Sequence, residues 1–377
     1  MLFDPTRHEA LQLLPWDETR VRAFIQHIVA DTEARFSPDR YWPTHPRDLD
    51  AGDDPAQRCT PLYHGACGVI WALHYLQDVG AARLSRRYDD ALDTLLMRNR
   101  AWLGETAERE QASYLMGDTP ILLLAQGQHP STERAERVAA LIEGNREHPA
   151  RELMWGSPGT LLAALFLHQR SGEARWAELF QRTAATLWSQ LEWSAEHACH
   201  YWTQDLYGQR VNYIDAVHGF VGTASALIRG RHLLGAETWA AWEQCIVNTV
   251  QRTATWEGAQ ANWRPWLDAT PGKPLRMLMQ HCHGAGLRRL SGRPARHRPR
   301  RTADRRRRSG VGGRPAHQRL EPVPRHGRQW LRLPQALATH GSADVAGACA
   351  GLRDARHRAD RGRCRAPWPT ALLAVDR

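Results

Sequence analysis

Strongly apolar runs recur along the chain, and each run follows a small or polar residue and a glycine. Full copies of this unit begin at Gly65, Gly156, Gly219 and Gly284, and a looser copy begins at Gly117. The runs after the glycines are apolar nearly all round, a pattern that predicts helices buried on every side.

A second, amphipathic helix is predicted after each buried one. Residues 175–193 show this best, because their apolar positions fall on one helical face. Those positions are Trp176, Leu179, Phe180, Leu187 and Leu191. The buried runs are expected to stop at Gly80, Gly172 and Gly235, since glycine takes left-handed dihedral angles without a Cβ clash.

Repeated hairpins of one buried and one half-buried helix predict an all-α fold, because signals for β-strands are sparse. We expect an α/α toroid, with inner helices around an axis and outer helices as a jacket; an open helical solenoid is the alternative. Glycine before each inner helix would let several helix N-termini approach closely around the axis. The loops at residues 33–60 and 253–274 are expected to cross one mouth of the ring.

The chain divides into three parts. Residues 1–61 are expected to form a helical segment and a loop that lead into the toroid, residues 62–286 carry the repeats, and residues 287–377 form a tail. The tail has 23 Arg, no Lys and 6 acidic residues, so its net charge is +17 and the first 286 residues carry the remaining −7. It also lacks Ile, Phe, Tyr, Asn and Met, as expected of GC-rich DNA translated out of frame.

The genetic code is compatible with such a shift of reading frame. Residues 323–336 can be encoded so that the codons one base later read Cys-His-Gly-Thr-Gly-Gly-Asn-Gly-Tyr-Ala-Phe-Leu-Lys, a glycine-rich turn before an apolar helix start. Our hypothesis is that a working gene ends at about Ala285 and that the tail is irregular or disordered. An intact frame on resequencing the locus would refute it.

Charge and composition exclude several classes of function. The basic excess lies entirely in the tail, which has little aromatic content, so we expect no nucleic-acid binding. No apolar stretch approaches the length of a membrane span, and no signal peptide is visible. The 7 scattered cysteines fit reduced thiols. These features predict a cytoplasmic protein.

Residues beside the glycines are the candidates for chemistry. Inner helices would direct their N-terminal dipoles and N–H groups into one pocket, which favours an anion such as a thiolate or enolate. The candidates are His64, Trp155, His218 and Cys282, each one or two residues before a glycine, and Asp118, which follows one. His218 is a candidate general acid or base, with a core histidine bonded to a carbonyl group as the alternative. For Asp118 the alternative is an ordinary helix N-cap.

Cys282 is followed by His283, and the shifted frame supplies a second Cys-His pair. Two cysteines and one histidine leave tetrahedral Zn2+ with an open fourth position, the layout of a catalytic site. Zinc there would deprotonate a substrate thiol. The chain as printed supplies only Cys282 of that set. A single cysteine binds zinc weakly, and the alternative interpretation of Cys282 is an inert, buried thiol.

These motifs resemble the lanthionine synthetase C-like family. The resemblance runs from about Leu62 to Ala285 and continues in the shifted frame, and its specific marks are the two Cys-His-Gly motifs. It implies a toroid of seven helical hairpins with one zinc ion bound by two Cys and one His. Members of the family add thiols to dehydroalanine or dehydrobutyrine: cyclases form lanthionine rings within a peptide, and relatives add glutathione to dehydrated proteins.

By this resemblance, Cys282 is similar to the first zinc ligand, His218 to the catalytic histidine and Asp118 to the aspartate of a Gly-Asp motif. His283 would face the substrate, and His64 and Trp155 would line its pocket. The implied partners are a dehydrated peptide or glutathione as substrate, and a dehydratase. The family's Pro-Gly after Cys-His-Gly-Ala is missing, and so are the second ligand pair and the last hairpins, so impaired activity is expected.

Two other functions fit parts of the pattern. A toroidal glycosidase or epimerase needs paired carboxylates beside tryptophans that stack on sugars. The tryptophans available for this are Trp155, Trp202, Trp263 and Trp266. Asp118, however, has no clear carboxylate partner at the start of a repeat. The second alternative is a truncated, inactive scaffold.

Overall fold

The computed structural model describes residues 15–45, 54, 58–257, 260–268 and 282. The predicted tail at residues 287–377 and the candidate His283 lie outside these residues. The described part of the chain is rich in helix and has no large sheet, in agreement with the predicted all-α class.

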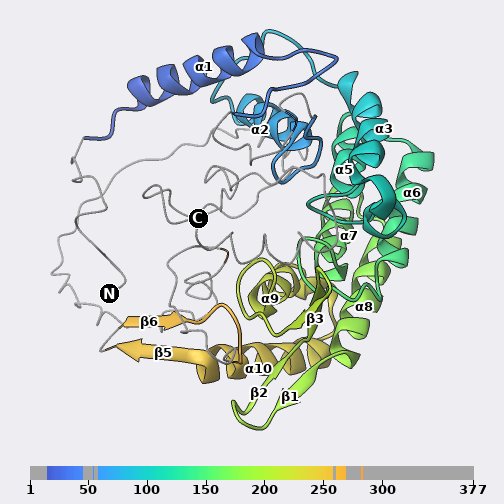
Figure 1. Cartoon of the computed structure of the whole chain (residues 1–377), viewed down its shortest axis with the longest axis vertical. Helices are drawn as coiled ribbons and strands as arrows, with labels where there is room; N and C mark the ends of the chain where they lie inside the picture. The colour runs from blue at the N-terminus through green and yellow to red at the C-terminus, as the bar shows by residue number, and fades with distance from the viewer. Residues whose placement is uncertain (1–14, 46–53, 55–57, 258–259, 269–281, 283–377) are drawn as a thin grey trace, which may run out of the picture.

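The helices form two layers along an arc (Figure 1). The inner layer comprises α2 (Ala66–Asp78), α5 (Thr119–Gln128), α7 (Ser157–Ser171) and α9 (Phe220–Arg229). The outer layer comprises α1 (Glu18–Ala34), α3 (Ala91–Leu103), α6 (Thr132–Gly144), α8 (Ala174–Ser189) and α10 (Ala236–Thr253). A short helix, α4 (Ala107–Glu110), follows α3. The alternation of inner and outer helices along the chain is the predicted succession of helical hairpins.

Burial separates the two layers as the sequence pattern predicts. In α7 every residue from Ser157 to Leu167 is buried, so this helix has no wet face. In α8 only one face is buried, and it carries Trp176, Leu179, Phe180 and Leu187. Leu191 lies beyond the end of α8 and is half-buried. The main apolar core therefore lies between the layers and around the inner helices.

The glycines that precede the inner helices lie in close contact with the loop that leads into the same helix. A Cβ atom on Gly219 would lie 2.2 Å from the backbone nitrogen of Asp215, and one on Gly65 would lie 2.6 Å from that of Pro61. Glycine therefore allows a close approach here, as predicted, but the partner is the preceding loop and not a neighbouring helix N-terminus. The cause is local: the loop folds back under the first turn of the helix that it precedes.

The predicted helix ends are correct in two cases out of three. Gly172 caps α7 in the left-handed conformation (φ +70°), and Gly80 takes φ +69° just after α2. The prediction for Gly235 is wrong, because α9 already ends at Arg229 and Gly235 begins α10 with φ −63°. The aromatic ring of Phe180 occupies the space beside Gly230, where a Cβ would meet it at 2.1 Å.

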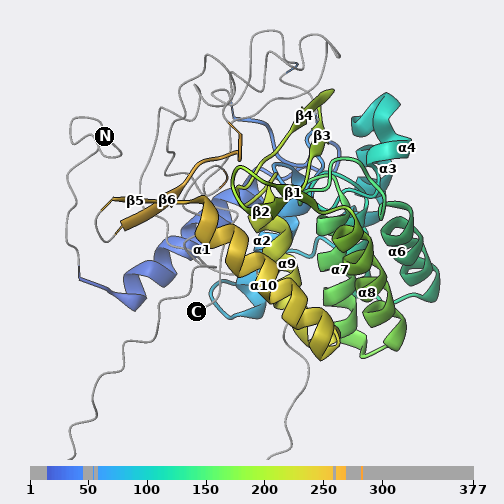
Figure 2. The ribbon, with the colours of Figure 1, turned by 90° about the horizontal axis from the view of Figure 1, so that it is seen from below.

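The described residues also form three short antiparallel hairpins, which the sequence did not predict: two lie between α8 and α9, and one follows α10 (Figure 2). They are β1 (Glu192–Ser194) with β2 (Cys199–Tyr201), β3 (Gln204–Leu206) with β4 (Gln209–Val211), and β5 (Ala254–Glu257) with β6 (Gln260–Trp263). Strands of three or four residues are too short to show the alternation that identifies a strand. The predicted loop at residues 253–274 therefore begins with a β-hairpin.

Two further expectations can be compared with the described residues. No helix among them combines the length and apolarity that a membrane crossing needs. Of the described cysteines, none forms a disulfide; they are Cys59, Cys67, Cys199, Cys245 and Cys282. Burial raises the pKa of the Cys67 thiol, which packs in the main apolar core.

Candidate active site

A repeated turn precedes three of the inner helices. Its first residue lies four positions before the glycine and is Ser113, Glu152 or Asp215. The side-chain oxygen of this residue accepts a hydrogen bond from the N–H group of the residue just before the glycine. The donors are Met116, Trp155 and His218, at 2.9, 2.6 and 2.7 Å respectively. Local hydrogen bonding thus fixes the residue in front of each glycine.

Backbone hydrogen bonds join consecutive turns to one another. The N–H of Tyr63 donates to Leu115 O at 3.0 Å, Leu115 N–H donates to Met154 O at 3.4 Å, and Leu153 N–H donates to Val217 O at 3.1 Å. The residues before the glycines are consequently held along one rim of the arc. This arrangement agrees with the expectation that they gather at one end of the inner helices.

His218 and Glu152 form a buried pair at this rim. Nδ1 of His218 lies 2.9 Å from Oε2 of Glu152; His218 is 4% exposed and Glu152 is fully buried. The carboxylate also accepts hydrogen bonds from the N–H groups of Met154 and Trp155, at 2.8 and 2.6 Å. The carboxylate oxygen accepts the hydrogen bond, so Nδ1 of His218 carries the proton and the ring is in its Nδ1–H tautomer.

This arrangement differs from the core histidine bonded to a carbonyl group that was the alternative for His218. A buried carboxylate on one ring nitrogen fixes the tautomer and orientation of a histidine that works as a base. Glu152 is absent from the residues predicted from the sequence. Its signal was its place four residues before Gly156, the place that Asp215 occupies before Gly219.

Cys282 packs against an apolar cluster at the same rim, here called the Cys282 cluster. Its buried members include Met116, Met154, Trp155 and Val217, and its partly buried members include Tyr63, Tyr207 and Tyr213. Cys282 itself is half-buried. The ring of Tyr213 lies 5.8 Å from that of His218, centroid to centroid. Cys282 and the histidine ring are thus linked through Tyr213, which belongs to the Cys282 cluster and contacts His218.

Trp155 and His64 differ in their relation to the Cys282 cluster. Trp155 belongs to it and is 9% exposed, and its indole N–H donates to the hydroxyl of Tyr207 at 3.1 Å. The ring of His64 makes edge contacts with Tyr63 and Trp102, each at 5.6 Å between centroids. Both residues thus lie at this rim, and their role in lining a substrate pocket stays a prediction.

Asp118 lies in a different network. Its fully buried carboxylate accepts hydrogen bonds from Asn99 Nδ2 (3.1 Å), Arg100 Nε (3.1 Å) and Arg137 (2.9 Å). These residues belong to the outer helices α3 and α6. Asp118 occupies the N-cap position of α5 but makes no side-chain capping bond. Asp118 thus connects the inner helix α5 to the outer helices α3 and α6. It is not part of the His218–Glu152 pair.

We expect Asp118→Asn to lower the free energy of unfolding by about 2–3 kcal/mol, because hydrogen bonds to charged groups contribute that much and both arginines would lose a charged partner. Chemical denaturation measures the change. Asp93→Asn is the matched control, since Asp93 is exposed in the first turn of α3 and its loss should cost at most about 0.5 kcal/mol. Equal stabilities of the two variants would contradict the anchoring role.

A group that could hold a metal ion lies elsewhere in the described part of the chain. It consists of Glu196, His197 and Asp268, whose ligand atoms lie within 4.8 Å of one another. His197 Nε2 is 3.3 Å from Asp268 Oδ1 and 3.9 Å from Glu196 Oε1. The carboxylates are 82% and 54% exposed, so the group lies at the surface, where the β1–β2 turn meets Asp268.

Two of the tryptophans considered for sugar stacking lie in the core. Trp202 is fully buried and its ring N–H donates to Leu187 O, and Trp263 is 2% exposed and donates to Val250 O. The ring of Trp202 packs between Phe220 of α9 and Trp242 of α10. Two of the four tryptophans invoked for a carbohydrate enzyme are therefore structural.

The chain matches no protein-family model and no curated protein sequence.

Proposed function

We propose that this protein belongs to the thioether-forming enzymes that its motifs resemble. They add a thiol, from a peptide cysteine or from glutathione, to dehydroalanine or dehydrobutyrine. The observation that carries the proposal is the His218–Glu152 pair beside the Cys282 cluster. It provides a proton-transferring group, oriented by a buried carboxylate, at the start of an inner helix. The proposal includes a closed toroid of helical hairpins, of which the described helices form an arc, a dehydratase that supplies the substrate, and a cytoplasmic location.

The chemistry can be written with residues of this chain. Nε2 of His218 takes the proton of the substrate thiol, while Nδ1–H donates to Glu152 and stabilises the imidazolium ion. The thiolate sulfur forms a bond to the β-carbon of the dehydroamino acid, and the electron pair of the carbon–carbon double bond moves to the α-carbon and its carbonyl group. The imidazolium then returns the proton to the α-carbon. The N-terminus of α9 favours the negative charge that develops.

The zinc site implied by the resemblance does not fit the described residues. That site needs two thiolates and one imidazole around one ion. Cys282 instead packs among apolar and aromatic side chains, and the one group of three ligands among the described residues is Glu196, His197 and Asp268. The proposed proton transfers therefore use His218 and Glu152 alone. We expect activity to be impaired in this chain because its affinity for zinc is lost.

The test is thiol addition by the full chain to a synthetic dehydroalanine peptide, followed by mass spectrometry. Glutathione and a cysteine peptide are offered in separate reactions. The wild-type protein is expected to form an adduct faster than the uncatalysed reaction. His218→Asn is expected to reduce that rate by about 10²- to 10⁴-fold, the usual contribution of general acid–base catalysis.

His129→Asn is the matched control, because His129 is 67% exposed and lies 4.0 Å from a carboxylate of Asp89. It should retain the wild-type rate. Zinc content, measured by atomic absorption, is compared with that of a variant whose tail is rewritten in the shifted frame. Only the rewritten protein is expected to hold about one zinc per chain. An equal rate in the wild-type and His218→Asn proteins would refute the proposed role of His218.

A further inference from the structure

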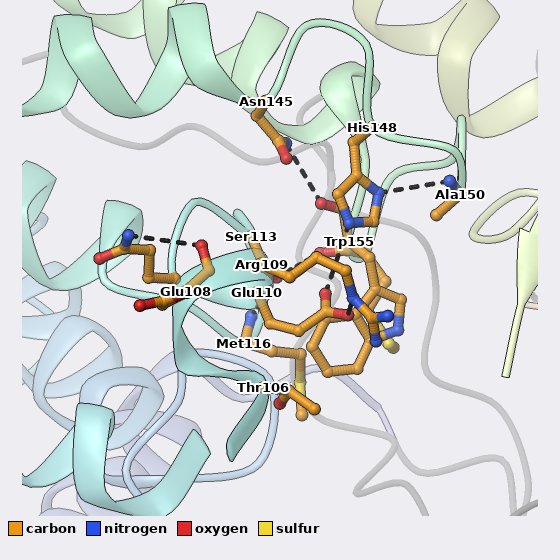
Figure 3. Close-up of polar contacts among 12 residues, drawn as sticks. Thr106, Glu108, Arg109, Glu110, Ser113, Met116, Asn145, His148, Ala150 and Trp155 are labelled. Atoms are coloured by element: carbon orange, nitrogen blue, oxygen red, sulfur yellow. Dashed lines mark hydrogen bonds and ion pairs between the residues drawn. The ribbon is translucent and has the colours of Figure 1, made fainter. Parts of the chain in front are cut away.

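The loop that carries Glu152, residues 145–156, contains a second buried contact between a histidine and a carboxylate. His148 lies in this loop and Glu110 ends α4, and their side chains are 9% and 10% exposed. His148 Nε2 is 3.6 Å from Glu110 Oε2, and neither atom has a hydrogen-bond partner among the described residues. Figure 3 shows the ring and the carboxylate facing each other beside Trp155.

The other ring nitrogen of His148 identifies its tautomer. The N–H group of Ala150 donates to His148 Nδ1 at 3.3 Å (Figure 3). Nδ1 must therefore hold a lone pair, and the single proton of the neutral ring is on Nε2, directed at Glu110. The contact with Ala150 can exist only while the ring is neutral, because a protonated ring has a donor at both nitrogens.

Charges on three sides act on this ring. Burial lowers the pKa of His148, the charge of Glu110 raises it, the charge of Arg109 lowers it, and that of Asp205 raises it; the net direction is downward. Arg109 Nε is bonded to the second oxygen of Glu110 at 2.7 Å. The neutral ring is thus favoured in the folded protein, and folding stability falls as the pH drops below about 6.5, where the unfolded chain binds the proton first.

We propose that His148 is a positioning residue that couples its own protonation to the His218–Glu152 pair, an inference that rests on the proposed role of His218. When His148 is neutral, its contact with Ala150 holds the loop in the observed conformation. When His148 gains a proton, Nδ1–H meets the N–H of Ala150, and the charged ring is drawn towards Glu110. The bond to Ala150 then breaks and the first half of the loop moves.

The connection from His148 to Glu152 is short. Arg151, between Ala150 and Glu152, has a left-handed backbone (φ +46°), which a non-glycine residue adopts only under constraint. Its N–H donates to the carbonyl of His148 at 3.3 Å. A shift of residues 148–150 therefore relaxes Arg151 and changes the angle at which Glu152 meets Nδ1 of His218. Acid conditions would in this way weaken the hydrogen bond that Glu152 makes with His218.

The experiment is a pH titration of the full chain, with the imidazole ¹⁵N signals followed by NMR and assigned by single histidine substitutions. In the wild-type protein, the His218 signals are expected to show a transition at the same pH as those of His148. This transition should be lost in His148→Gln and should persist in His129→Gln. The readout needs no substrate, so failure of the thiol-addition assay would leave it unaffected.

Charge variants keep the test decisive if His148→Gln does not fold. Glu110→Gln removes a charge that raises the His148 pKa, so the transition sensed by His218 should move to lower pH. Arg109→Gln, at a side chain that is 67% exposed, removes a charge that lowers the pKa, so the transition should move to higher pH. His218 signals that titrate identically in all these proteins would overturn the proposal.

Discussion

Glu152→Gln is expected to slow thiol addition by about 10²- to 10⁴-fold, although Glu152 itself touches no substrate. Glutamine has one oxygen where the carboxylate has two. The carboxylate receives Nδ1–H of His218 and the Met154 N–H at one oxygen and the Trp155 N–H at the other. In the variant an NH2 group must face at least one of these donors. The ring of His218 loses its fixed tautomer, and stability falls by about 1–3 kcal/mol.

The rate of adduct formation and the ¹⁵N signals of His218 measure this effect. Glu147→Gln is the matched control, because Glu147 lies in the same loop but is exposed and bonded to Gln190 at the surface. If Glu152→Gln leaves both the rate and the His218 tautomer unchanged, the carboxylate does not orient the base. If Glu152→Gln changes the His218 tautomer but the wild-type protein shows no measurable thiol addition, then Glu152 orients His218 and the proposed reaction is wrong.

Gly219→Ala should destabilise the fold by about 3 kcal/mol or more, because the added methyl group would meet backbone atoms that cannot rotate away. Its Cβ would lie 2.2 Å from Asp215 N and 2.5 Å from two backbone atoms of Ile214. Relief would require the turn of Asp215 to open, and this turn holds the N–H of His218. Thermal and chemical denaturation measure the loss.

Gly144→Ala provides the opposite control. Gly144 ends α6 and has no atom within 4 Å of the position that a Cβ would take. Alanine is the better helix former, so this variant should gain up to about 1 kcal/mol. Equal effects of the two substitutions would show that close approach is not the reason for glycine at position 219.

Sequence patterns predicted the features that depend on residues close together in the chain. Buried runs after glycines gave α2, α5, α7 and α9, and the one-sided apolar pattern gave the buried face of α8. His218 was found because it stands directly before a glycine of the repeat. These features depend on residues a few positions apart, and helical periodicity encodes such distances directly.

Features that depend on distant residues were not predictable in the same way. His218 and Glu152 are 66 positions apart, and Glu152 is not part of the glycine motif. Asp118 was placed correctly at the start of an inner helix, but the arginines that receive its carboxylate come from two outer helices. The sequence pattern of one helix does not indicate which neighbouring helices the side chain at its N-terminus contacts.

The hydrogen bonds between successive turns have a consequence for how the molecule can vary. Each turn takes its position from the one before it, so lengthening any of them by a residue would displace every later turn, and His218 with them. At the opposite ends of the inner helices the chain reverses through exposed Gly80 and Gly172, where extra residues would meet only water. Insertions should therefore be tolerated at the ends of the helical hairpins that carry Gly80 and Gly172, and excluded from the rim around His218, where the length of each turn sets the position of the next.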